Sequence, residues 1–78
     1  MVPFDARLKV DDETLDFSFN RVHTTDREKL VINVKRGSVY FAFDMIKGDA
    51  GKWRIAEPAP AWARELEGAL STVIIQNL

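Results

Sequence analysis

The chain contains no cysteine and only one histidine among its 78 residues. The lack of cysteine excludes disulfide bonds and thiolate metal sites, and a single histidine excludes a site built from several histidines. No apolar run approaches the roughly 20 residues of a membrane-spanning helix, and the N-terminal residues lack the apolar stretch of a signal peptide. We therefore expect a cytoplasmic protein with no cofactor and no membrane partner.

An excess of one charge sign is also missing. The 11 basic and 12 acidic side chains give a formal net charge of -1, and neither sign forms a block. Proteins that bind nucleic acid or anionic membranes commonly carry a basic patch or stripe. The overall charge therefore gives no signature for either kind of partner.

A chain this short has a thin core and a small stability margin. Small folds usually compensate with disulfides, a metal or oligomerisation. The sequence excludes disulfides and contains no metal-binding motif. Oligomerisation is the compensation that is left, and the alternative is an unusually well packed monomer.

The hydrophobic pattern changes period once along the chain. Apolar residues recur at every second position over residues 4–55, and at every third or fourth position after Trp62. The first period is typical of half-buried strands and the second of an amphipathic helix. Polar turns divide the first part into five strands within 4–57, and Pro60 suits the first turn of a helix over about 60–76. The sequence predicts one α+β domain over 1–78, a five-stranded antiparallel meander with one C-terminal helix across one face.

The helix is predicted to pack on an aromatic face of the sheet. Its apolar stripe consists of Trp62, Leu66, Ala69, Leu70 and Val73. The sheet face consists of Phe17, Phe19, Phe41, Phe43 and Trp53. We expect the two tryptophans to be buried together where sheet and helix meet.

The other side of the helix carries little charge, although a solvated face normally carries more. At about 100° per residue, this side holds Ala61, Gly68, Thr72 and Ile75, with Arg64 and Ser71 beside them. Glycine in mid-helix costs about 1 kcal/mol relative to alanine, and the close approach of a second helix would explain it. We interpret this side as a dimer contact, and the alternative is a neutral exposed face that tolerates glycine.

The second face of the sheet is predicted to be polar and partly basic. Its candidate nucleic-acid-binding residues are Arg7, Lys9, Lys35, Tyr40, Lys52 and Arg54. Such a platform binds single strands when cations contact phosphates and aromatics stack on bases. Tyr40 is the one obvious stacking aromatic, and Asp5, Asp16 and Asp44 would repel phosphates. An ordinary solvated face with cross-strand ion pairs is therefore the preferred interpretation.

Together these patterns predict a small non-enzymatic interaction domain that forms a homodimer, with an unidentified protein partner. The alternative is a single-stranded nucleic-acid-binding module that uses the polar sheet face. An enzyme whose site forms only at a dimer interface has no motif in its favour. Whether a dimer uses the helix or a sheet edge stays open.

Overall fold

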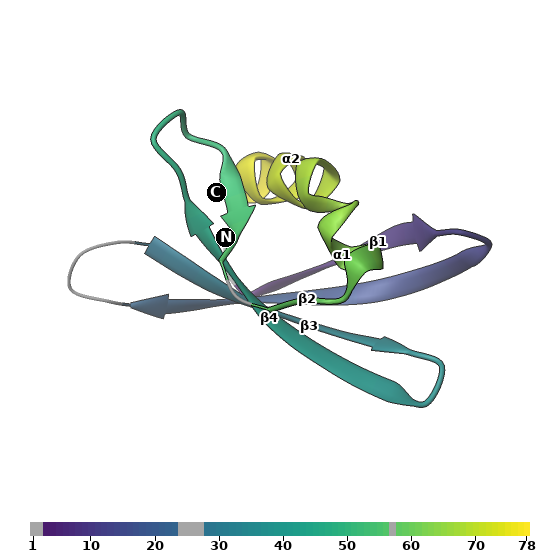
Figure 1. Cartoon of the computed structure of the whole chain (residues 1–78). Coiled ribbons are helices and arrows are strands. Elements are labelled where there is room, and N and C mark those ends of the chain that lie inside the picture. The colour runs from purple at the N-terminus through teal and green to yellow at the C-terminus, as the bar shows by residue number, and fades with distance from the viewer. Residues whose placement is uncertain (1–2, 24–27, 57) are drawn as a thin grey trace.

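The computed structural model describes residues 3–23, 28–56 and 58–78 of the chain. Within these residues, five antiparallel strands form one curled sheet, and two short helices follow it (Figure 1). The strands pair in chain order, so the predicted meander and the α+β class are confirmed. The strands are β1 (Phe4–Val10), β2 (Glu13–His23), β3 (Glu28–Arg36), β4 (Val39–Lys47) and β5 (Trp53–Ile55), and the helices are α1 (Ala61–Arg64) and α2 (Glu67–Asn77).

Two-residue turns fix the register of the sheet. Val10 pairs with Glu13 across the first turn, and Arg36 pairs with Val39 across the third. Tight hairpin loops of this length require a positive φ, and Asp11 (φ 55°) and Gly37 (φ 64°) supply it. With these turns in place, the alternating apolar residues of neighbouring strands face the same side of the sheet.

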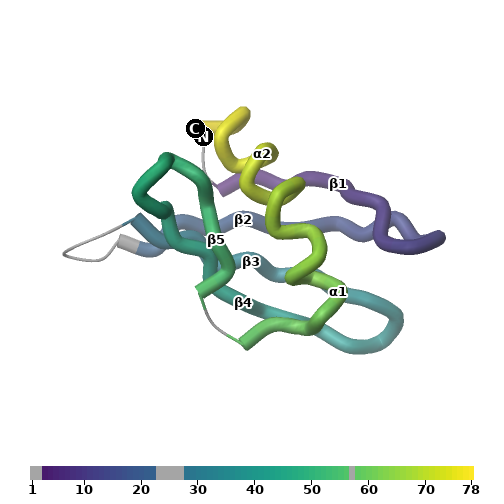
Figure 2. The backbone as a smooth tube through the Cα atoms, turned by 45° about the horizontal axis from the view of Figure 1, so that its top comes forward, coloured from purple at the N-terminus to yellow at the C-terminus, as the bar shows by residue number. Residues whose placement is uncertain are grey.

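That shared face forms the core, as the alternation predicted. Phe17, Phe19 and Ile32 are fully buried in one cluster with Leu70 and Ile74 of the helical segment. The helical segment lies over this side of the sheet (Figures 1 and 2). Each fully buried side chain of this size contributes about 1.5–3 kcal/mol. Burial of this face therefore holds the helical segment against the sheet.

The helical segment is interrupted, which the sequence pattern did not predict. A turn at Glu65 and Leu66 separates α1 from α2, and the Leu66 N–H donates to the Ala63 carbonyl oxygen at 3.0 Å. This bond to the third preceding residue tightens the turn relative to an α-helix. Pro60 precedes the first helical residue instead of occupying the first turn, and its carbonyl oxygen accepts the N–H groups of Ala63 and Arg64.

The interruption changes which residues are buried. The predicted stripe is correct for four residues and wrong for Ala69, which is exposed. Three residues outside the stripe are buried instead: Ala63, Ser71 and Ile74. A count at 100° per residue fails here because the tightened turn shifts the helical phase. In addition, α2 packs on the core face of the sheet with Leu70 and Ile74, and a second side of α2 bonds to the edge strand β5 through Glu67 and Ser71.

The two tryptophans occupy different environments. Trp53 is buried on β5, as expected, but Trp62 is only half-buried. The Trp62 ring packs edge-on against Phe17 and Phe41, with centroid distances of 6.5 and 5.4 Å. The expectation of two buried tryptophans is therefore correct for Trp53 alone.

Arg36 lies over the ring of the half-buried Trp62. Its guanidinium carbon lies 5.0 Å from the Trp62 ring centroid, and the same group donates to Asp11 and Glu13 at 2.9 Å each. These hydrogen bonds, that to Asp11 first, raise the pKa of Arg36. The guanidinium stays charged and ties the two hairpin turns to the helical segment.

Candidate interaction surfaces

One border of the sheet, β5, is closed by α2. The helix lies over the inner side of the curled sheet, beside this strand (Figure 2). Ser71 Oγ accepts the Trp53 N–H at 2.9 Å, and Glu67 Oε2 accepts the Ile55 N–H at 2.8 Å. The outward donors of β5 are therefore bonded within the chain, which prevents another strand from pairing with them.

The spacing of the two acceptors matches the spacing of the donors. Four residues along a helix cover about 6.0 Å, and two residues along a strand cover about 6.6 Å. Glu67 and Ser71 stand four positions apart, and they meet Ile55 and Trp53 in the reverse chain direction. Side chains at i and i+4 share one side of a helix. This Glu-x-x-x-Ser spacing is the signal that the sequence analysis missed.

The other border, β1, has an open outer edge. Val10 and Glu13 close the turn to β2, and the pair that closes such a turn is hydrogen-bonded in both directions. Bonding alternates from there along β1, so the N–H groups of Asp5, Arg7 and Lys9 point outward. These three groups donate no hydrogen bond to another described residue. A seven-residue edge of this kind is a template for a further strand.

The outward-facing charges of β1 are unevenly paired. Arg7 Nε lies 2.9 Å from Asp16 Oδ1, and both side chains are exposed. Asp5 and Lys9, on either side of Arg7, form no ion pair with another described residue. The acid Asp5 and the base Lys9, without ion pairs in the described part of the chain, therefore lie on either side of Arg7, whose charge is balanced by Asp16.

The inner side of β1 is only partly covered. Phe4, Ala6 and Leu8 pack against the core but stay half-exposed, whereas Val10 is buried. The Phe4 ring stacks on Phe19 with a centroid distance of 4.6 Å. An apolar row therefore extends to the open border of the sheet.

The residues predicted for a helical dimer face are divided between the two helices. Ala61 belongs to α1, whereas Gly68, Thr72 and Ile75 belong to α2, and all four are exposed. Ser71 was expected beside them, but it is buried because its hydroxyl bonds to β5.

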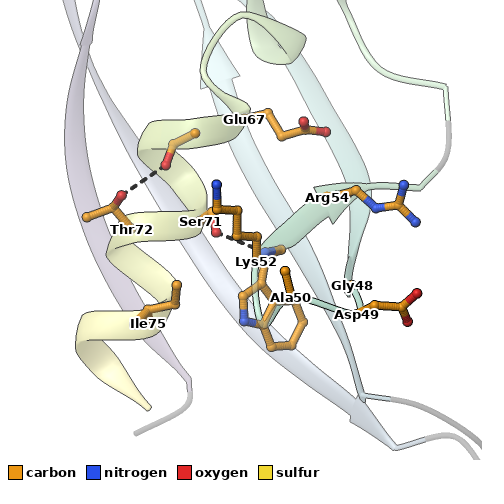
Figure 3. Close-up of a pocket in the computed structure, with 11 residues that line it drawn as sticks. Gly48, Asp49, Ala50, Lys52, Arg54, Glu67, Ser71, Thr72 and Ile75 are labelled. Carbon is orange, nitrogen blue, oxygen red and sulfur yellow. Dashed lines mark hydrogen bonds between the residues drawn. The ribbon is translucent and has the colours of Figure 1, made fainter.

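The α2 members of this set line an open groove of about 730 Å³ between α2 and the β4–β5 hairpin (Figure 3). The opposite wall includes Lys52 and Arg54, which the sequence analysis had assigned to the sheet face. The groove therefore contains residues that the sequence analysis assigned to two different surfaces, the helical dimer face and the nucleic-acid-binding face of the sheet.

The polar groups of the groove do not converge on one point. The side chains of Arg54 and Asp49 point away from α2 in Figure 3. The Thr72 hydroxyl donates to the Gly68 carbonyl oxygen at 3.1 Å, and Glu67 is bonded to β5. The groove therefore offers small side chains, hydroxyl groups that are already hydrogen-bonded, and the Lys52 side chain, which extends toward α2 beside Ser71 (Figure 3).

The other predicted nucleic-acid contacts lie on the outer face of the sheet, and two of the three cations are engaged. Arg7 pairs with Asp16, and Lys35 Nζ lies 5.1 Å from the Tyr40 ring centroid. A cation over the ring occupies a surface on which a base would stack. Lys9 has no ion pair with another described residue.

This outer face is also less polar than predicted. The register places Val22, Val31 and Ile46 on it, interleaved with the Lys29–Asp44 ion pair at 2.9 Å. The sequence analysis considered only the polar members of these strands. A mixture of apolar residues and ion pairs is typical of an ordinary solvent-facing sheet.

No known protein family, curated protein or solved structure matches this chain. Among the residues that the structure describes, no helix is long and apolar enough to cross a bilayer. Nor do three or more potential metal-ligating side chains gather anywhere in this described part.

Proposed function

We propose that this chain is a small non-enzymatic interaction domain that works as a homodimer. The observation that carries the proposal is the contrast between the two borders of one sheet. Two helix side chains close β5, while the outward N–H groups of β1 have no partner among the described residues. Open edges bind further strands through backbone hydrogen bonds. Association also supplies stability that a core of this size lacks.

Two acidic side chains, one at the groove and one on the sheet, have structural partners, which supports a binding role over a catalytic one. Glu67 bonds to the backbone of β5, and Asp44 pairs with Lys29 at 2.9 Å. These acids hold elements of the fold together. The cytoplasmic location expected from the sequence stays a prediction.

The nucleic-acid alternative has less support. Its candidate cations are split between the outer sheet face and the groove, and Lys35 lies over Tyr40. We expect no binding of single-stranded oligonucleotides that weakens steeply with salt, the behaviour that phosphate contacts produce. Fluorescence anisotropy at two salt concentrations measures this.

Sedimentation velocity at micromolar concentration tests the homodimer, with Arg7→Pro as the informative variant. Proline removes an N–H group that the monomer leaves outside its own ladder, and edge strands tolerate proline at such positions. We expect the wild type to sediment as a dimer and the folded Arg7→Pro variant as a monomer. Arg7→Ala is the matched control, because it loses the Asp16 ion pair but keeps the N–H group.

A second variant separates this dimer from one formed by the helices. Ile75→Glu places a charge on α2, on the side first predicted as the contact. We expect Ile75→Glu to leave the dimer intact. A dimer that survives Arg7→Pro but dissociates in Ile75→Glu would contradict the β1 assignment and support the helical contact.

A further inference from the structure

We infer that the strand that pairs with β1 is β1 of a second copy, antiparallel and centred on Arg7. The inference rests on the proposed self-association and adds the partner strand and its register. In this arrangement two five-stranded sheets become one continuous sheet across a two-fold axis. The interface is isologous, the commonest kind in homo-oligomers.

The hydrogen-bond pattern of the free edge allows this pairing. The outward backbone groups belong to Asp5, Arg7 and Lys9, and antiparallel pairing requires them to face outward groups of the partner. Centred on Arg7, each Arg7 exchanges two hydrogen bonds with its counterpart, and each Asp5 pairs with a Lys9. The whole strand Phe4–Val10 is then paired.

The charges favour this register over its neighbours. Asp5 and Lys9 have no ion pair within the described chain, and here each faces the other twice across the axis. The two Arg7 side chains meet at the centre, but each is bound to its own Asp16 at 2.9 Å. Opposite charges on directly facing residues stabilise a sheet, and like charges destabilise it.

Two neighbouring registers, centred on Ala6 and on Leu8, also keep the inner sides of the two strands together. Both pair fewer residues of β1. A pairing centred on Ala6 leaves Lys9 without a facing residue on the partner strand and shortens the paired segment. A pairing centred on Leu8 leaves Phe4 and Asp5 without facing residues on the partner strand, because β1 ends at Val10, and it places Lys9, which has no ion pair with another described residue, opposite Arg7. Only the register centred on Arg7 pairs every residue of the strand and matches the flanking charges.

The inner side of β1 is complementary in the same register. Phe4 faces Val10 of the second copy, and Ala6 faces Leu8. Phe4, Ala6 and Leu8 are the residues that the single chain leaves half-exposed at this border. Pairing joins the two apolar rows and removes part of this surface from water, which is favourable.

Charge reversal tests the register in the full chain. Asp5→Lys turns two attractive cross-strand pairs into repulsive ones, so we expect the dimer dissociation constant to rise about tenfold. The double variant Asp5→Lys, Lys9→Asp restores opposite charges and should return the constant to near the wild-type value. A register in which Asp5 faces Arg7 predicts no such rescue, and that result would overturn the inference.

Single cysteines provide a geometric test, because the natural chain has none. Facing residues of a hydrogen-bonded pair have Cα atoms about 5.5 Å apart, within the range of a disulfide. Arg7→Cys should therefore form a disulfide-linked dimer under mild oxidation. Lys9→Cys, the matched control on the same face, should not, because its two copies stand about 14 Å apart.

The outcomes separate the two proposals. A chain that dimerises, but in which Arg7→Cys fails to cross-link and Lys9→Asp fails to rescue Asp5→Lys, overturns the register and leaves the homodimer standing. A chain that stays monomeric at high micromolar concentration overturns both. Sedimentation of each folded variant, with circular dichroism to verify folding, provides the readout.

Discussion

Replacing Ser71 with alanine tests the bond that closes β5. Ser71 is 6% exposed, and its Oγ accepts the buried Trp53 N–H at 2.9 Å. Alanine keeps the Cβ but leaves that N–H without an acceptor, which costs about 1–3 kcal/mol. The better helix propensity of alanine returns up to about 0.5 kcal/mol. We expect the free energy of unfolding to fall by about 0.5–3 kcal/mol.

Urea unfolding, followed by tryptophan fluorescence, measures this loss. For a domain of this size each 1 kcal/mol also lowers Tm by about 4–8 °C. Thr72→Ala is the matched control, because its exposed hydroxyl bonds only to the Gly68 carbonyl oxygen of the same helix. Thr72→Ala should change stability by no more than about 0.5 kcal/mol.

Hydrogen exchange locates the effect. The Trp53 amide should exchange faster in Ser71→Ala and at an unchanged rate in Thr72→Ala. If the two variants unfold at the same urea concentration and the Trp53 amide keeps its protection, then the Ser71 hydroxyl does not hold β5, and the account of this border is wrong.

Three further results follow from the same contacts. Glu67→Ala should lower stability by about 0.5–1.5 kcal/mol, the net contribution of one hydrogen bond, and the exposed neighbour Glu65→Ala should not, as urea unfolding would show. The double variant Glu67→Ala, Ser71→Ala should lower stability in urea unfolding by more than either single variant, because both outward N–H donors of β5 lose their acceptors while Leu70 and Ile74 keep α2 on the sheet. Arg36→Ala should lower Tm more than Arg7→Ala, because Arg36 loses two carboxylate partners and an aromatic contact, whereas the exposed Arg7 ion pair contributes little; equal shifts would contradict this.

The sequence predicted the strands well because each of them buries one face. Alternation places Phe17, Phe19 and Phe43 on the same side, and hydrophobic burial dominates folding. The polar turns located the strand ends, but not the register, which the structure fixes by pairing Val10 with Glu13 and Arg36 with Val39. Over residues 4–55 the alternating hydrophobic pattern matches the side chains that are buried in the sheet. The fold of this part could therefore be predicted from the sequence.

The helical segment shows where such prediction fails. Ala69 was assigned to the core and Ser71 to the exposed side, and both assignments are wrong. A helical count assumes one buried side and an uninterrupted helix. The turn at Leu66 breaks the helix, and β5 covers a second side of α2, which only the three-dimensional arrangement reveals.

The candidate surfaces were predicted only in part, because they depend on the neighbours of each strand. The basic residues were treated as one group, but Lys52 and Arg54 also line the groove beside α2, although Arg54 pairs with Ile46 and its side chain points away from the helix (Figure 3). The charges of Asp5 and Lys9 are plain in the sequence. These charges bear on self-association only because β1 is the border of the sheet that α2 leaves open.

Amide hydrogen exchange of Arg7 at two protein concentrations tests the proposed β1 interface most directly. Its N–H group points outward in the monomer and bonds to the partner strand in the dimer. The account predicts slow exchange of the Arg7 amide above the dimer dissociation constant and fast exchange below it, while Leu8, bonded to β2, stays protected at both. Fast exchange of Arg7 in a sample that sediments as a dimer would contradict it.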